Sequence, residues 1–263
     1  MRQGGDKPRP YERRGARPTR DKSRSSREPR EGKSGDKPRP YAPQRRLQAR
    51  DVAWLVARLE GVRAAVTPTT LAEVERKRDP FRLLIACVIS LRTKDAVTAE
   101  ASARLFAVAR TPDGVAALPE RRIAKLIFPA GFYNTKARQI REIARRIAAE
   151  HRGAVPPDLD TLLAFPGVGR KTANLVLGLG FGIPAICVDT HVHRISNRLG
   201  LVRTTTPEQT EHALEKVLPQ RYWIDINDLL VTFGQQICHP TSPRCSACPL
   251  APRCPRIGVT RSR

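Results

Sequence analysis

From about residue 47 onward, hydrophobic residues recur with a helical period, and the chain shows no strand-like alternation. Residues 47–59 fit one helix, and residues 81–90 fit a second that is apolar on all sides and therefore buried. A third helix follows with Asp95 as its N-cap. A fourth has Pro119 in its first turn and continues to Ile127.

The longest predicted helix opens at Asn134 and ends before Gly153. One of its faces is apolar, and the other carries four arginines that we expect to be solvated. Residues 206–209, Thr-Pro-Glu-Gln, form a capping box with proline in the first turn of another helix. A last helix over residues 223–237 leads into Cys238. The pattern therefore predicts an all-α fold.

The net charge of the chain indicates the kind of partner that it binds. Lys and Arg total 48 against 25 Asp and Glu, a net charge of +23, which favours a polyanion such as nucleic acid as partner. Residues 1–46 hold 16 Lys/Arg and 6 Asp/Glu, with many Pro, Gly and Ser, and are predicted to be a disordered basic tail. Residues 5–11 recur as residues 35–41. The tail is interpreted as an electrostatic arm for DNA, with a merely solubilising role as the alternative.

Four cysteines near the end, Cys238, Cys245, Cys248 and Cys254, have the spacing C-x6-C-x2-C-x5-C. Thiolates bind soft metals, so this run predicts a metal or iron–sulfur centre. Zinc ligands usually come as two short pairs separated by a longer stretch, whereas one compact run favours an iron–sulfur cluster. Structural zinc remains the alternative, and a disulfide pair is the least favoured interpretation.

A helical hairpin is predicted at residues 160–174. A short helix stops at residues 165–169, Phe-Pro-Gly-Val-Gly, and a second begins at Arg170. The glycines Gly167 and Gly169 leave backbone amides open at a helix N-terminus, which is a site for a phosphate group. A nucleotide P-loop is excluded because Arg170 interrupts Gly-Lys-Thr and a helix precedes the turn. A ligand-free turn is the alternative, which the net charge disfavours.

Three runs in order carry a resemblance: residues 165–174, residues 188–194 (Val-Asp-Thr-His-Val-His-Arg) and the four cysteines. Together they resemble the endonuclease III family of helix-hairpin-helix DNA glycosylases, from about residue 47 to the last cysteine. The resemblance implies two helical lobes with a DNA-binding cleft between them. Residues 73–183 would form a helical barrel lobe containing the hairpin (about 159–180), and residues 47–72 and 184–263 the iron–sulfur lobe.

The resemblance implies a bifunctional DNA glycosylase and AP lyase of base excision repair that acts on oxidised pyrimidines in duplex DNA. Lys171 would attack the sugar of a flipped nucleotide and form a Schiff base that leads to β-elimination. Asp189 would stabilise the developing positive charge and assist proton transfer, while it also caps a helix. The four cysteines would hold a [4Fe-4S] cluster.

The resemblance also implies where DNA is bound. Phe132 would be an apolar wedge, and Arg92 stands where the family commonly has glutamine, which affects opposite-base preference. Arg244, between the first two cysteines, would contact phosphates. The other expected contacts are Gly167, Gly169, Arg170, Thr172 and Arg194. A monovalent cation would bind the backbone carbonyls of Leu163, Phe165 and Val168.

Two alternatives remain. A monofunctional mismatch glycosylase for thymine or adenine would lack lysine at position 171, and a non-catalytic, zinc-stapled DNA-binding protein would make Lys171 and Asp189 incidental. His191 and His193 are two residues apart on a helix and are not expected to share a metal. We expect a monomer with no membrane span, located in the cytoplasm at the nucleoid if the protein is bacterial.

Overall fold

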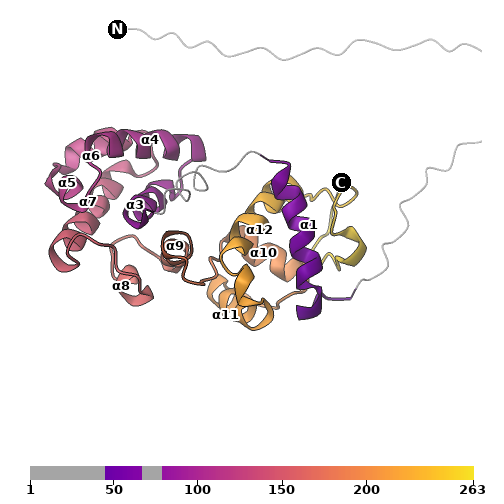
Figure 1. Ribbon diagram of the computed structural model, residues 1–263. Coiled ribbons are helices and arrows are strands. Elements are labelled where there is room, and N and C mark those ends of the chain that lie inside the picture. The colour runs from indigo at the N-terminus through magenta and orange to yellow at the C-terminus, as the bar shows by residue number, and fades with distance from the viewer. Residues whose placement is uncertain (1–44, 67–78) are drawn as a thin grey trace, which may run out of the picture. The chain divides into compact units, whose positions relative to one another are not determined.

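The computed structural model describes residues 45–66 and 79–263, and these residues form helices and no strand (Figure 1). The chain divides into two units, residues 1–41 and 42–263, and every described residue belongs to the second. The predicted tail therefore lies outside the described residues, apart from Arg45 and Arg46. The predicted lobe boundary at residues 72–73 lies outside them as well.

The predicted all-α fold is confirmed. Short helical turns lie at Ala49–Asp51, Gln220–Tyr222 and Ala251–Arg253, and a π-helical segment at Val176–Gly180 continues directly from α9. The α-helices are α1 (Val52–Ala64), α3 (Pro80–Ser90), α4 (Asp95–Val108), α5 (Pro112–Ala117), α6 (Glu120–Ile127), α7 (Tyr133–Glu150), α8 (Leu159–Leu163), α9 (Arg170–Leu175), α10 (Thr190–Arg198), α11 (Pro207–Val217) and α12 (Asp225–Gln236).

Several predicted helix starts are wrong by a few residues. Asp95 lies in the first turn of α4 and not at its N-cap, which is Lys94 without a side-chain capping bond. Pro119 is the N-cap of α6 and not part of its first turn. The short helix α5 was not predicted; Thr111 caps it by accepting a hydrogen bond from the Gly114 N–H. Local propensity places a helix more reliably than it places the end residue.

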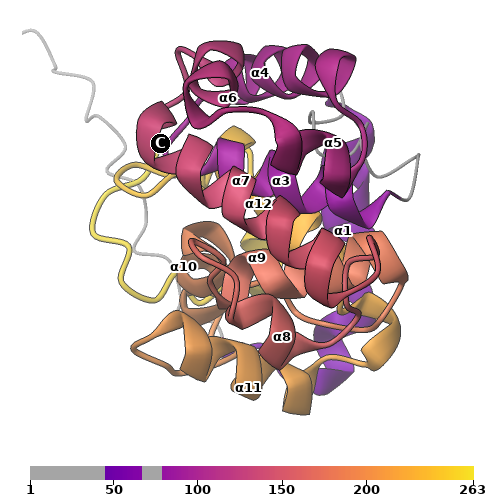
Figure 2. The same ribbon diagram turned by 90° about the vertical axis from the view of Figure 1, so that its left-hand side faces the viewer.

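One hydrophobic core forms around α3, whose side chains are almost all buried, as the continuous apolar pattern predicts. Helices α4, α7 and α9 and the π-helical segment contact α3, and α5 and α6 pack against α7 (Figure 2). The apolar face of α7 contributes Ile140, Ile143 and Ile147 to this core. The core therefore fixes the hairpin helix α9 against α3.

A second core joins segments that are far apart in the sequence. Helix α1 packs on α12, α12 packs on α10, and α10 packs on α11. Leu55, Ile195 and Phe233 are among the buried side chains of this core, together with Cys238 and Cys254. The first described helix thus lies against the chain's last helix, which leads into the cysteine loop (Figure 1).

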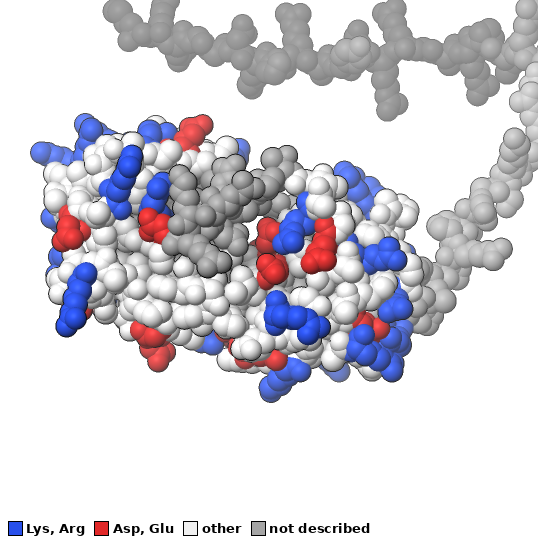
Figure 3. All heavy atoms as spheres, in the orientation of Figure 1, with Lys and Arg blue, Asp and Glu red and all other residues white. Residues whose placement is uncertain are grey.

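Charged side chains do not form a single stripe on the face in Figure 3, where Lys and Arg are interspersed with Asp and Glu. In residues 45–66 and 79–263, no helix combines the length and the apolar character that crossing a bilayer would require.

Candidate active site

The helical hairpin is present, with a sharp turn between α8 and α9. Asp158 caps α8, because its carboxylate accepts a hydrogen bond from the Thr161 N–H at 2.9 Å. Gly167 has φ = 78°, a left-handed conformation that favours glycine. Gly169 is the N-cap of α9, and a Cβ placed there would meet nothing within 4 Å. The fold itself thus requires glycine at 167, but leaves the backbone at 169 open to an approaching group.

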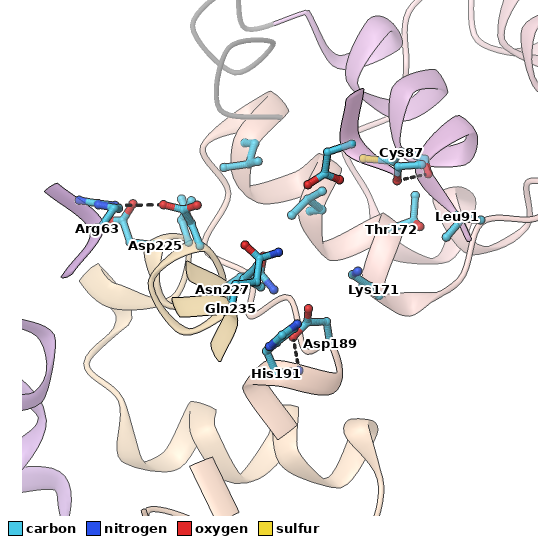
Figure 4. Close-up of a pocket in the computed structure, with 17 residues that line it drawn as sticks. Arg63, Cys87, Leu91, Lys171, Thr172, Asp189, His191, Asp225, Asn227 and Gln235 are labelled. Atoms are coloured by element: carbon cyan, nitrogen blue, oxygen red, sulfur yellow. Dashed lines mark hydrogen bonds and ion pairs between the residues drawn. The ribbon is translucent and has the colours of Figure 1, made fainter. Parts of the chain in front are cut away.

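Lys171 and Asp189 line the same cavity, which has a volume of about 280 Å³ (Figure 4). Lys171 is exposed in the first turn of α9, and Thr172 beside it is buried in the cavity wall. Asp189 comes from the N-terminus of α10. The amine and the carboxylate are therefore presented from the starts of two different helices to one cavity.

Asp189 is fixed by its capping role, as predicted for this side chain. Its Oδ1 accepts hydrogen bonds from the His191 and Val192 N–H groups, each at 2.8 Å. His191 lines the cavity, whereas Nδ1 of His193 lies 2.6 Å from Oγ1 of Thr210. The two histidines thus have different surroundings. Burial lowers the pKa of His191, and the cations Arg194 and Lys171 lower it further.

Arg170 has an intramolecular partner that the sequence analysis missed. Its Nε and Nη2 lie within 3.0 Å of the Glu211 carboxylate, and Glu211 is only 4% exposed. This ion pair joins the hairpin to α11 and raises the pKa of Arg170. The guanidinium is therefore held by a carboxylate, whereas the backbone N–H of Arg170 remains at the start of α9.

Arg194 and Arg198, one helical turn apart on α10, both hold the cysteine loop. Nη2 of Arg194 donates to the Cys238 carbonyl at 2.9 Å and lies 3.2 Å from Nδ1 of His191. Nη1 of Arg198 donates to Sγ of Cys238 at 3.3 Å and to the His239 carbonyl at 2.9 Å. The same helix that carries Asp189 at its start therefore anchors the cysteine loop.

The four cysteines surround one small cavity between α10, α12 and the chain's end, together with apolar Phe233, Leu250 and Val259. Burial, and then the neighbouring cysteines, raise the pKa of the Cys248 thiol to about 11. Among the described residues, no three His, Cys, Asp or Glu side chains converge as ligands of a single ion. Four thiols around a shared cavity form a donor set that suits an iron–sulfur cluster.

The two loops expected to enter the DNA stack contact each other. Arg92 and Phe132 both have left-handed backbones, with φ of 52° and 57°. Phe132 is 64% exposed, and the Arg92 guanidinium lies 5.6 Å from the centre of its ring. The structure therefore brings together two residues that the sequence analysis assigned to separate loops.

Polar residues from α4 and α12 also line the Lys171 cavity, and the sequence analysis assigned none of them to the site. Asp95 opens α4, and Asn227 and Gln235 lie on α12 (Figure 4). Nδ2 of Asn227 donates to the Cys187 carbonyl at 3.0 Å, which fixes the orientation of its amide. No local motif marks these residues, because only packing of the two cores brings α12 to the cavity.

Comparison with known proteins identifies the family of this chain. Residues 85–220 match the HhH-GPD superfamily of base excision DNA repair proteins. Endonuclease III of Thermotoga maritima is 51% identical over 179 residues, which cover 68% of this chain and 84% of that protein. The chain therefore belongs to the HhH-GPD superfamily and, within it, to the endonuclease III family. Its activity is that of a DNA glycosylase and AP lyase of base excision repair.

Solved structures have the same fold. A trapped endonuclease III–DNA covalent intermediate, an estranged-adenine complex, superposes with a TM-score of 0.67 at 34% identity, covering 79% of this chain and 96% of that one. A thermostable thymine-DNA glycosylase superposes with a TM-score of 0.68 at 27% identity, covering 78% and 95%. An iron–sulfur cluster is typical of the endonuclease III family.

Proposed function

We propose that this enzyme removes oxidised pyrimidines from duplex DNA with Lys171 as nucleophile and then cleaves the strand as a lyase. The observation that carries the proposal is the placement of Lys171 and Asp189 on one cavity, each at the start of a helix. The cavity of about 280 Å³ is close to the lower end of the size range of small-molecule sites, about 300 Å³. It is therefore a suitable place for a flipped nucleotide.

The neutral amine of Lys171 attacks C1′ of the flipped nucleotide, and the bond between C1′ and the base breaks with its electron pair leaving on the base. Asp189 stabilises the positive charge that develops on the sugar and moves a proton between the amine and the departing groups. The sugar ring then opens: the C1′–O4′ bond breaks, O4′ takes up a proton that the amine has lost, and an imine forms between Nζ and C1′. This imine makes the C2′ proton acidic. Loss of that proton expels the 3′-phosphate and cuts the strand, and water then releases Lys171 by hydrolysing the imine.

The hairpin would bind a phosphate group of the same strand. The first N–H groups of α9 have no acceptor within the helix, and the open space beside Gly169 allows a close approach to the backbone. A phosphate bound there would place the sugar beside Lys171, two residues further along. Thr172, which is buried in the cavity wall next to Lys171, would contact the bound DNA at the same place. A monovalent cation on the carbonyls of Leu163, Phe165 and Val168 would stiffen the same turn.

Phe132 would fill the gap that the flipped base leaves, since it is apolar and exposed beside Arg92. Arg92 would face the opposite base and affect which base is tolerated there. Exposed Arg244 would contact phosphates from the cysteine loop. Arg194 would contribute from the side of α10, although its guanidinium is held by the Cys238 carbonyl.

Cys238, Cys245, Cys248 and Cys254 would hold a [4Fe-4S] cluster. When bound, the cluster supplies positively charged iron that keeps the thiolates ionised and ties the loop together. The two hydrophobic cores would correspond to a barrel lobe and a cluster lobe. The protein would act as a monomer, and it would work at the nucleoid if it is bacterial.

Borohydride trapping tests the function. It reduces the imine between Lys171 and DNA to a stable adduct, so we expect a covalent complex with duplexes that contain an oxidised pyrimidine or an abasic site. Lys171→Gln should form none. If Lys171→Gln forms as much covalent adduct as wild type, Lys171 is not the nucleophile. If wild type excises the base without an adduct, base removal does not proceed through an imine on Lys171, and the proposed mechanism is wrong.

A further inference from the structure

Lys136 is a buried lysine on the apolar side of α7. It is only 4% exposed, in the first turn of the helix and one turn before buried Ile140. A cation at this end of a helix faces the positive end of the helix dipole, and burial adds a desolvation cost. Burial accordingly lowers its pKa to about 8. A side chain placed this unfavourably must be compensated by specific partners.

The partners of Lys136 lie in the last turn of α3 and on the loop that follows it. Its Nζ donates to the carbonyls of Ile89 at 2.6 Å and Leu91 at 2.5 Å, and to Oγ1 of Thr93 at 2.9 Å. These bonds use all three ammonium protons. The carbonyls at the C-terminal end of α3 carry the negative end of that helix's dipole, which favours a cation. Among the residues that the structure describes, no carboxylate forms a salt bridge with Lys136.

Thr93 extends the connection to the loop that precedes α7. Its Oγ1 also accepts a hydrogen bond from the Gly131 N–H at 3.1 Å. The two loops touch so closely here that a Cβ on Gly131 would lie 2.5 Å from the Arg92 carbonyl oxygen. Lys136, Thr93 and Gly131 therefore bind the end of α3 and the start of α7 into one unit.

Two strained residues project from this unit. Arg92 and Phe132 both have positive φ, a conformation that non-glycine residues adopt only when their surroundings hold it. Each is adjacent in sequence to a residue of the network, Arg92 to Thr93 and Phe132 to Gly131. Their mutual stacking, with the guanidinium 5.6 Å from the ring centre, depends on the two loops keeping this separation.

We propose that Lys136 is a positioning residue that holds Arg92 and Phe132 in place before DNA binds, so that the pair enters the helix as one preformed wedge. The inference rests on the proposed function, in which these two residues replace the flipped nucleotide and face the opposite base. Lys136 touches neither the substrate nor the reacting atoms. Its effect is on excision from duplex DNA, where a gap must be filled, and not on the chemistry of Lys171.

The test compares Lys136→Met with Lys125→Met in the full chain purified with its cluster. Both changes remove one lysine charge, but Lys125 is exposed on α6. Two quantities are measured: the single-turnover rate of base excision from a lesion-containing duplex, and borohydride trapping on a single-stranded abasic oligonucleotide, which needs no flipping or gap filling. We expect Lys136→Met to lower the duplex rate about 100-fold, as misplaced groups do. Its single-stranded trapping, and both activities of Lys125→Met, should match wild type.

A double-mutant cycle separates positioning from general destabilisation. If Lys136 acts through the wedge, Lys136→Met should lower the duplex rate little further once Phe132→Ala has removed it. Thr93→Val, which removes only the bridging hydroxyl, should reproduce the pattern more weakly if Lys136→Met fails to fold. A wild-type duplex rate for Lys136→Met, or an equal loss of duplex excision and single-stranded trapping, overturns the inference. Wild-type protein that neither excises nor traps overturns the proposed function itself.

Discussion

Nη1 of Arg198 donates a hydrogen bond to Sγ of Cys238 at 3.3 Å, and the Arg198 side chain is almost completely buried, with 7% of the residue exposed. The same guanidinium donates to the carbonyls of His239 and Pro240. One cation therefore supports both the first cysteine and the backbone that follows it. The contact therefore fixes the position of the sulfur atom that we propose as the first ligand of the cluster.

Replacement of Arg198 should weaken iron binding. Arg198→Met removes the charge and leaves the carbonyls of His239 and Pro240 without this donor, so we expect less iron per purified chain and a paler protein. Exposed Arg244 lies in the same loop and serves as the matched control. Arg244→Met should keep its iron but bind duplex DNA more weakly, with a smaller salt dependence. Equal iron content in Arg198→Met and wild type would show that the hydrogen bond does not matter for the cluster.

The two glycines of the hairpin should respond differently to alanine. Gly167→Ala forces a Cβ into a left-handed conformation and should destabilise the fold by about 1 kcal/mol. Gly169→Ala meets open space at a φ of −96°, so the fold should tolerate it. If a phosphate approaches that backbone, Gly169→Ala should nevertheless lower the affinity for abasic-site duplex DNA. Thermal unfolding and a binding titration check the two effects, and unchanged affinity would argue against phosphate binding at Gly169.

Asp189 has two roles that conservative substitutions can separate. Asn at position 189 can accept the same capping hydrogen bonds, so Asp189→Asn should unfold at nearly the wild-type temperature. It lacks the negative charge and the proton-transfer capacity, and its excision rate should fall by about 100-fold. Asp189→Ala should lose the cap as well and cost about 1 kcal/mol of stability. If Asp189→Asn keeps full activity, Asp189 is only a helix cap.

Loss of the Arg170–Glu211 ion pair should lower the free energy of unfolding, in addition to any effect on DNA binding. Arg170→Met leaves the buried Glu211 carboxylate without its partner, and we expect a loss of about 3 kcal/mol. The double variant Arg170→Met/Glu211→Met replaces both charges with apolar side chains and should recover most of that loss. Chemical denaturation measures the free energy of unfolding of the wild type, the single variant and the double variant. A double variant as unstable as the single one would refute the explanation by buried charge.

Asp51 should make stability depend on acidic pH. Its hydrogen bond with Arg45, aided by the Gln48 N–H and by the charge of Arg253, lowers its pKa to about 2. Because the folded-state pKa is lowered, the contribution is complete above the ordinary value near 4 and disappears as pH falls to about 2. Arg45 is half exposed, so we expect only about 1 kcal/mol at neutral pH. Asp51→Asn should show this loss at pH 7, but not at pH 2, in unfolding experiments.

Much of this protein follows from the sequence by itself. Hydrophobic periodicity predicted the all-α fold, and the buried helix α3 followed from a continuous apolar run that no solvated helix could carry. Lys171 and Asp189 were assigned from two short runs, residues 165–174 and 188–194, that resemble the endonuclease III family, and such runs are local features of the chain. The capping by Asp189 was predicted for the same reason, since an N-cap needs only the next three residues.

Only the tertiary structure decided which groups meet across long sequence separations. The pairing of Arg170 with Glu211, of Arg198 with Cys238 and of Lys136 with the loop after α3 depends on how helices pack. The sequence analysis did not single out Lys136, and its partners lie more than 40 residues away along the chain. Burial makes such polar partners necessary, and the three-dimensional fold determines which ones are within reach.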